Sequence, residues 1–195
     1  MATGSPASPT ALQSESIDLP IFEPEGNYEV LYGEVVEKPA MGVFETWIAT
    51  KLSGWLLRST GVQDHGRVVS EMLFLLDLAK DLKCRPDLAF VSYERWARTR
   101  PVPRAAAWDV IPDLAIEVIS PTNLASKVIV KVRDYFKYGV RCLWVVYPVE
   151  ELIYVYDSPT SIQVLTGADT LESPAILPGF QLPLGQLFES ESTSP

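Results

Sequence analysis

The sequence predicts an α/β domain built around a mixed β-sheet. Short apolar segments of strand length alternate with two segments in which apolar residues recur at helical spacing. Their order along the chain is strand, helix, three strands, helix and two strands. With 195 residues, of which 47% are hydrophobic and 21% charged, the chain is long enough for a substantial core. We expect a disordered tail over residues 1–20, which are rich in Ser, Thr, Pro and Ala, a single domain over residues 21–190, and a second disordered tail over residues 191–195.

The first half of the domain contains one helix between strands. Residues 28–37 have the composition of a strand that is interrupted by a turn or bulge at Gly33. Residues 43–59 place Phe, Trp, Ile and Leu at helical spacing, which predicts an amphipathic helix. Three further strands are expected at residues 67–76, 86–92 and 113–120.

The second half begins with a helix over residues 125–138. Ser126 is its expected N-cap and Gly139 its expected stop. Strands follow at residues 142–147 and 152–156, and the remaining proline-containing segment is expected to pack in extended form over the surface.

The net charge of −9 does not exclude a nucleic-acid substrate, because the charge is unevenly distributed. Residues 1–29 contain five acids and no base, and residues 150–195 contain seven acids and no base. Residues 30–149 carry all 16 Lys and Arg against 13 Asp and Glu, so the centre of the chain is mildly basic.

Several classes of protein are disfavoured by what the sequence lacks. Its two cysteines, Cys84 and Cys142, have no metal-site spacing and are expected to be buried thiols. A single histidine, His65, in an expected turn, excludes a multi-histidine metal site. We find no glycine-rich nucleotide loop and no Ser/His/Asp or Cys/His set, so a nucleotide cofactor and covalent hydrolysis are not expected. No apolar run approaches the ~20 residues of a membrane span and no signal peptide is visible, which predicts a cytoplasmic protein without a membrane partner.

Two strands begin with the same Pro-Asp motif. The first runs from Arg85 to Ser92 and the second from Ile111 to Ser120. The second contains a carboxylate, Glu117, within an otherwise apolar run. Because burial of a lone carboxylate is costly, Glu117 is expected to be paired or to bind a metal.

Strand geometry indicates which carboxylate lies beside Glu117. Asp113 is on the same strand face but about 13 Å away at ~3.3 Å per residue, too far to share one ion. If the two Pro-Asp strands pair antiparallel, Asp87 lies near Glu117 and Asp113 lies at the far end. The predicted metal pair is therefore Asp87 and Glu117, whose carboxylates, completed by water, suit Mg²⁺ or Mn²⁺.

Cationic side chains occur on the following helix and in the loop between the Pro-Asp strands. Lys127 and Lys131 are four residues apart and share one helix face. Lys131 could orient an attacking water and stabilise transition-state charge, although both lysines could also be ordinary solvated surface. In the loop, Tyr and Trp alternate with arginines in a pattern that suits phosphate contact and base stacking, or a solvated loop anchored by its Trp. The four arginines, which together with Lys127 are predicted nucleic-acid contacts, are Arg95, Arg98, Arg100 and Arg104.

Taken together, these motifs resemble the Uma (Uma-two) family of restriction endonucleases within the PD-(D/E)xK nuclease superfamily. The resemblance covers roughly residues 28–188. It rests on the two Pro-Asp strands, the Lys131 helix that ends in Tyr-Gly-Val, the strand at 143–146 and the closing Leu-Pro-Gly-Phe-Gln-Leu-Pro-Leu segment.

The resemblance implies a restriction-endonuclease-like αβββαβ core with an N-terminal hairpin added. It implies that Asp87 and Glu117 bind the metal and that Lys131 supplies the catalytic cation from the helix, because Ile119 occupies the usual strand position of that lysine. Glu34 matches a further acidic catalytic position in the family. Glu71 is a candidate on a different ground, namely that it is polar within an apolar strand. The chain departs from the family pattern at three positions: Lys127 and Tyr147 stand where members often carry Asp, and Phe44 lies where many carry His.

Our leading hypothesis is a divalent-metal-dependent endonuclease that hydrolyses DNA phosphodiester bonds. The alternative is a catalytically degenerate nuclease-fold protein that binds or regulates, and a third possibility is a hydrolase of small phosphate esters. A homodimer could form if the apolar strands at residues 28–31 and 152–156 offer free edges.

Overall fold

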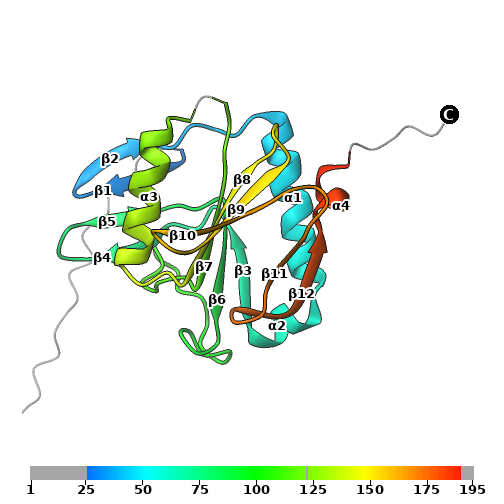
Figure 1. Cartoon of the computed structure of the whole chain (residues 1–195). Coiled ribbons are helices and arrows are strands. Elements are labelled where there is room, and N and C mark those ends of the chain that lie inside the picture. The colour runs from blue at the N-terminus through cyan, green and yellow to red at the C-terminus, as the bar shows by residue number, and fades with distance from the viewer. Residues whose placement is uncertain (1–25, 122, 190–195) are drawn as a thin grey trace, which may run out of the picture.

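The computed structural model describes residues 26–121 and 123–189, so the two predicted disordered tails lie outside the described residues. A six-stranded sheet forms the centre of the molecule (Figure 1). In the spatial order given below, the third and fourth strands run parallel to each other. Every other pair of neighbouring strands in this sheet is antiparallel, so the sheet is mixed as predicted. In spatial order the strands are β10 (Ser161–Leu165), β9 (Leu152–Ser158), β8 (Cys142–Tyr147), β7 (Leu114–Val118), β6 (Leu88–Ser92) and β3 (Gly66–Ser70).

A smaller sheet of four strands lies beside the central one. Its order is β2 (Glu34–Glu37), β1 (Tyr28–Leu31), β5 (Leu82–Cys84) and β4 (Phe74–Asp77). The remaining elements are a ribbon of β11 (Thr170–Ser173) and β12 (Leu177–Pro183) and the helices α1 (Val43–Arg58), α2 (Thr60–His65), α3 (Ala125–Lys137) and α4 (Leu184–Phe188).

The central sheet has a separate apolar core on each face. On one face Leu52 of α1 packs with Trp144 of β8 and Phe180 of β12. On the other face Tyr135 of α3 packs with Leu143 of β8 and with residues of β4 and β5. Figure 1 shows α3 beside the small sheet and α1 beside β11, β12 and α4. The site described below lies on the α3 face.

The N-terminal hairpin confirms the expected glycine turn. Tyr32 and Gly33 between β1 and β2 have φ values of 56° and 86°. Left-handed conformations at both turn residues match the twist of a two-residue hairpin, and glycine adopts them without a steric cost.

One strand prediction is wrong, because residues 67–76 form two strands in different sheets. β3 ends at Ser70, and β4 begins at Phe74 and pairs with β5. Glu71 between them has a φ of 51°, a left-handed conformation that interrupts the strand. The apolar run alone looked continuous because the break depends on contacts with distant segments.

The C-terminal half contains more regular structure than expected. The tail forms β10, β11, β12 and α4 rather than only extended packing.

The segment before β3 forms the short helix α2, and His65 at its end is exposed. Gly139, with a φ of 96°, follows α3 as predicted, but the N-cap residue is Leu124 and makes no side-chain cap bond.

Two further expectations concern thiols and sheet edges. Cys84 and Cys142 are buried free thiols, as predicted, and burial raises the pKa of Cys142 to about 12. The edge prediction is wrong: β1 lies between β2 and β5, and β9 lies between β8 and β10, so neither is a free edge. No helix in the described part of the chain is long and apolar enough to cross a membrane.

A pair of glycine substitutions tests the packing of β3. A Cβ at Gly66 would overlap the Val91 carbonyl oxygen and the Phe90 ring, so Gly66→Ala is expected to lower the free energy of unfolding by about 1–3 kcal/mol. The matched control is Gly54→Ala in α1, where the nearest group is the flexible Arg58 guanidinium 3.8 Å away, and a gain of about 0.5–1 kcal/mol is expected. Urea denaturation measures both, and equal effects would contradict this packing.

Candidate active site

The register of β6 and β7 brings the predicted carboxylate pair together. The strands are antiparallel, and Ala89 lies opposite Ala115. Asp87 precedes Ala89 by two residues and Glu117 follows Ala115 by two, so in this register Asp87 lies across from Glu117. Asp113 lies at the opposite end of the strand pair. The expectation of antiparallel pairing, made from the sequence, is therefore confirmed.

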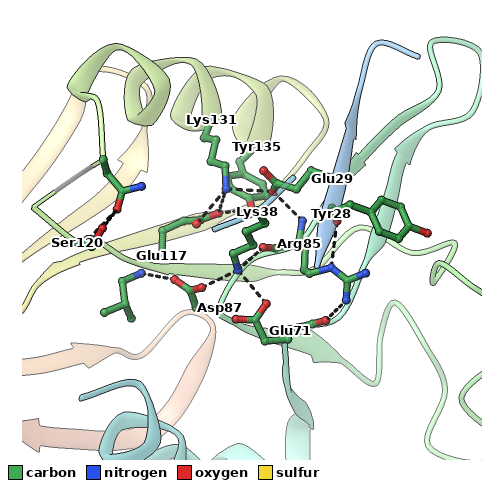
Figure 2. Close-up of polar contacts among 12 residues, drawn as sticks. Tyr28, Glu29, Lys38, Glu71, Arg85, Asp87, Glu117, Ser120, Lys131 and Tyr135 are labelled. Carbon is green, nitrogen blue, oxygen red and sulfur yellow. Dashed lines mark hydrogen bonds and ion pairs between the residues drawn. The ribbon is translucent and has the colours of Figure 1, made fainter. Parts of the chain in front are cut away.

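Asp87 is buried and bonded through both carboxylate oxygens. Its Oδ2 accepts a hydrogen bond of 2.6 Å from the backbone amide of Val118, and its Oδ1 lies 2.6 Å from the Nζ of Lys38 (Figure 2). Burial raises the pKa of Asp87, and the charge and hydrogen bond of Lys38 oppose that rise.

Lys38 follows β2 directly and was not anticipated from the sequence. Its ammonium also donates to Glu71 Oε2 and to the Arg85 carbonyl, each at 2.9 Å. Burial alone would lower the pKa of Lys38, but the negative charges of Asp87 and Glu117 outweigh burial and raise it. Lys38 therefore neutralises one side of the carboxylate pair.

Lys131 of α3 neutralises the other side. Its Nζ lies 3.1 Å from both carboxylate oxygens of Glu117 and 3.0 Å from Glu29 Oε1. Burial acts to lower the pKa of Lys131, yet the charges of Glu117 and Glu29 raise it well above its ordinary value. The buried Tyr135 hydroxyl donates to Glu117 Oε1 at 2.7 Å, and Glu29 also accepts the amide of Arg85 at 2.9 Å (Figure 2).

The carboxylates and lysines line a cavity of about 450 Å³. Its other walls combine apolar side chains of the β1–β2 hairpin, the segment 39–41, α3 and β8 with polar ones that include Ser120, Asn123 and Asp134. Within the described residues, no group of three or more His, Cys, Asp or Glu side chains is arranged to bind a metal ion. Asp87 and Glu117, the predicted metal pair, share the cavity lining with two further carboxylates, Glu29 and Asp134.

The structure gathers most of the predicted site residues but not all of them. Asp87, Glu117, Lys131 and Lys127 line the cavity. Glu34 does not line it, because it lies at the turn end of the hairpin and is exposed.

Three residues of the site were not assigned from the sequence. Glu29 interrupts the apolar run of β1 in the same way that Glu117 interrupts β7, and this signal could have identified it. Tyr135 lies one helical turn beyond Lys131, on the same helix face. Lys38 had no local signal, because it follows a short exposed strand.

The arginine-containing loop follows the end of β6 that is remote from Asp87. Arg95 Nε lies 2.9 Å from Asp113 Oδ1, and its guanidinium also donates to the carbonyls of Ile111 and Gly139. Arg95 therefore stabilises the buried Asp113 carboxylate, which also accepts the Ser92 amide at 2.8 Å.

The other three loop arginines are exposed. Arg100 stacks on the Trp96 ring with its guanidinium carbon 3.5 Å from the ring centroid, and Arg98 lies 5.4 Å from the centroid of Tyr93. Arg104 is also solvent-exposed. A nucleic-acid contact by these three side chains stays a prediction, and it concerns the end of β6 opposite the cavity.

Comparisons with known proteins agree with the fold and with the motifs. The Uma2 family model, described as "Putative restriction endonuclease", matches residues 13–185. A similar solved structure is the crystal structure of a putative nuclease belonging to DUF820 from Anabaena variabilis ATCC 29413. It has a TM-score of 0.71 and 21% sequence identity over 83% of this chain and 89% of that chain, a likeness that concerns the fold. No curated protein matches the sequence significantly.

A comparison of two glutamates tests which acid belongs to the site. Glu29→Gln removes one of the two carboxylates beside Lys131 and is expected to lower the free energy of unfolding by about 1–3 kcal/mol. Glu34→Gln, at an exposed position, is expected to change it by less than about 0.5 kcal/mol. Chemical denaturation without added metal measures both, and the reverse order would show that the hairpin is placed differently.

A second pair tests the structural assignment of Arg95. Arg95→Ala leaves the buried Asp113 with Arg141 as its remaining cation and is expected to cost about 2 kcal/mol of stability. Arg104→Ala at an exposed position is expected to leave stability unchanged within about 0.5 kcal/mol. Thermal denaturation distinguishes them, and an unaffected Arg95→Ala variant would return Arg95 to the candidate substrate contacts.

Proposed function

The chain belongs to the Uma2 family, and from this premise we propose that it is a divalent-metal-dependent endonuclease that hydrolyses phosphodiester bonds in DNA. The observation that carries the proposal is the pairing of Asp87 and Glu117 at one end of β6 and β7, inside a cavity and beside two lysines. An acid pair of this kind, flanked by cations, suits the binding and cleavage of a phosphate diester.

The residues present fit Mg²⁺ or Mn²⁺. Carboxylate oxygens are the ligands that these hard ions prefer, and two protein ligands leave the positions for water that Mg²⁺ usually retains. The Val118 amide orients Asp87, and the Tyr135 hydroxyl orients Glu117, so both ligands have supporting hydrogen bonds. An ion bound there would supply Lewis-acid polarisation of the phosphoryl group.

Lys131 acts in this proposal as a permanent cation rather than as a general base. Its ammonium lies 3.1 Å from Glu117 and 3.0 Å from Glu29, so it is held beside the carboxylate pair, where it can stabilise the negative charge that develops on the phosphoryl oxygens. Glu29 positions this ammonium by direct contact. Tyr135 positions it indirectly, through its hydrogen bond to Glu117. Asp87 and Glu117 are buried, which reduces solvent screening and strengthens the interactions of their charges.

A nuclease-fold binding protein without catalysis is the second candidate. The observation that favours it is that Lys38 and Lys131 already neutralise both carboxylates. The family-pattern departures at Lys127, Tyr147 and Phe44 point the same way. Such a protein would bind nucleic acid or a partner without requiring a metal ion.

Plasmid cleavage tests the proposal. Supercoiled plasmid is incubated with Mg²⁺ or Mn²⁺ and the wild type, Asp87→Asn, Glu117→Gln or Lys131→Met. We expect the wild type to nick the plasmid and each variant to lose about 100-fold or more in rate. Glu172→Gln, an exposed carboxylate on β11, is the matched control and should retain the wild-type rate.

Each remaining result has a defined meaning. Equal nicking by all variants would exclude this site and indicate a contaminating nuclease. DNA binding without cleavage, together with no metal binding by calorimetry, would favour the binding protein. Faster hydrolysis of a small phosphodiester than of DNA would exclude DNA as the preferred substrate. Circular dichroism of each variant shows whether loss of rate reflects loss of fold.

A further inference from the structure

The ammonium of Lys38 occupies a three-oxygen site beside the carboxylate pair. Its partners are Asp87 Oδ1 at 2.6 Å, Glu71 Oε2 at 2.9 Å and the Arg85 carbonyl at 2.9 Å. An ammonium has three N–H donors, so each donor has one acceptor. The Lys38 side chain is only 11% exposed, so the charge is enclosed by these partners and not loosely solvated.

The contact with Asp87 places Lys38 in competition with a metal ion. Oδ1 of Asp87 accepts Lys38, and Oδ2 accepts the Val118 amide, so neither oxygen is without a hydrogen bond. A divalent ion on this carboxylate would lie next to a like charge, in a site where burial reduces screening. Binding of the ion is therefore opposed as long as Lys38 keeps its contact with Asp87.

Glu71 provides a second place for the same ammonium. Its backbone amide donates to the Asp87 carbonyl at 3.1 Å, and its carbonyl accepts the Arg85 guanidinium at 2.6 Å. These bonds stabilise the left-handed conformation that directs the Glu71 carboxylate toward Lys38 (Figure 2). If Lys38 leaves Asp87, it still has Glu71 and the Arg85 carbonyl as partners.

We propose that Lys38 is a built-in competitor for the metal site, which bridges Asp87 and Glu71 in the metal-free protein and moves onto Glu71 when a divalent ion binds Asp87. This inference rests on the proposed function, since it requires a metal on Asp87 and Glu117. Lys38 is thus a positioning residue that sets the metal affinity, and Glu71 assists binding by accepting the displaced ammonium.

Titration of the purified protein with Mn²⁺ by calorimetry tests this role without any cleavage assay. Lys38→Met is expected to bind Mn²⁺ about tenfold more tightly than the wild type, because the opposing charge is gone. Lys38→Arg retains the charge and is expected to stay near wild-type affinity. Lys83→Met is the matched control, because it removes a lysine that pairs with the half-exposed Asp81.

Glu71→Gln is expected to change the affinity in the opposite direction. Without the Glu71 charge, Lys38 has less reason to leave Asp87, and Mn²⁺ binding should weaken. In the Lys38→Met background the same substitution should have a clearly smaller effect. This coupling in a double-mutant cycle would show that Glu71 acts through Lys38.

The outcomes separate this inference from the proposed function. Mn²⁺ binding that is unchanged or weaker in Lys38→Met overturns the competitor role and leaves the metal site intact. Absence of binding in both the wild type and Lys38→Met overturns the metal site and the competitor role together. If Lys38→Met does not fold without metal, Glu71→Gln keeps the test open, and unchanged or tighter Mn²⁺ binding by that variant overturns the inference.

Discussion

The hydrogen bond from the Val118 amide to the Asp87 carboxylate joins the end of β7 to the start of β6. At this point a hydrogen bond to a side chain takes the place of a backbone hydrogen bond between the two strands. The carboxylates of Asp87 and Glu117 are then buried at a junction of two sheets, where an uncompensated charge is costly. The rest of the site supplies the cations that this burial requires.

The two cations come from different parts of the fold, one from the small sheet and one from the helix that packs on the central sheet. Lys38 extends from the hairpin of the small sheet, and Lys131 extends from α3 on the central sheet. Removing either lysine would leave a buried carboxylate without its cation, a change that destabilises proteins more than the intact pair stabilises them. Stability and the proposed chemistry thus depend on the same contacts, and a metal ion would substitute for part of this compensation.

The two Pro-Asp motifs have different roles because their strands are antiparallel. Each aspartate precedes its strand, so antiparallel pairing places Asp87 and Asp113 at opposite ends of the sheet. Asp87 faces the cavity, whereas Asp113 accepts the Ser92 amide and pairs with Arg95 and Arg141. One sequence motif therefore supplies a candidate metal ligand at one end and a structural carboxylate at the other.

The sequence by itself determined the α/β class and the extent of α3, because strand alternation and helical spacing are local rules. It placed Asp87 near Glu117 only on the condition that their strands pair antiparallel, and the structure supplied that pairing. Only the tertiary structure decided that Glu34 stays outside the cavity and that Lys38 reaches Asp87 across 49 residues of chain. The tertiary structure also decided that the strand predicted over residues 67–76 is interrupted at Glu71. Such contacts depend on which distant segments lie close together and on where a buried charge must be neutralised. The periodicity of a short segment predicts neither.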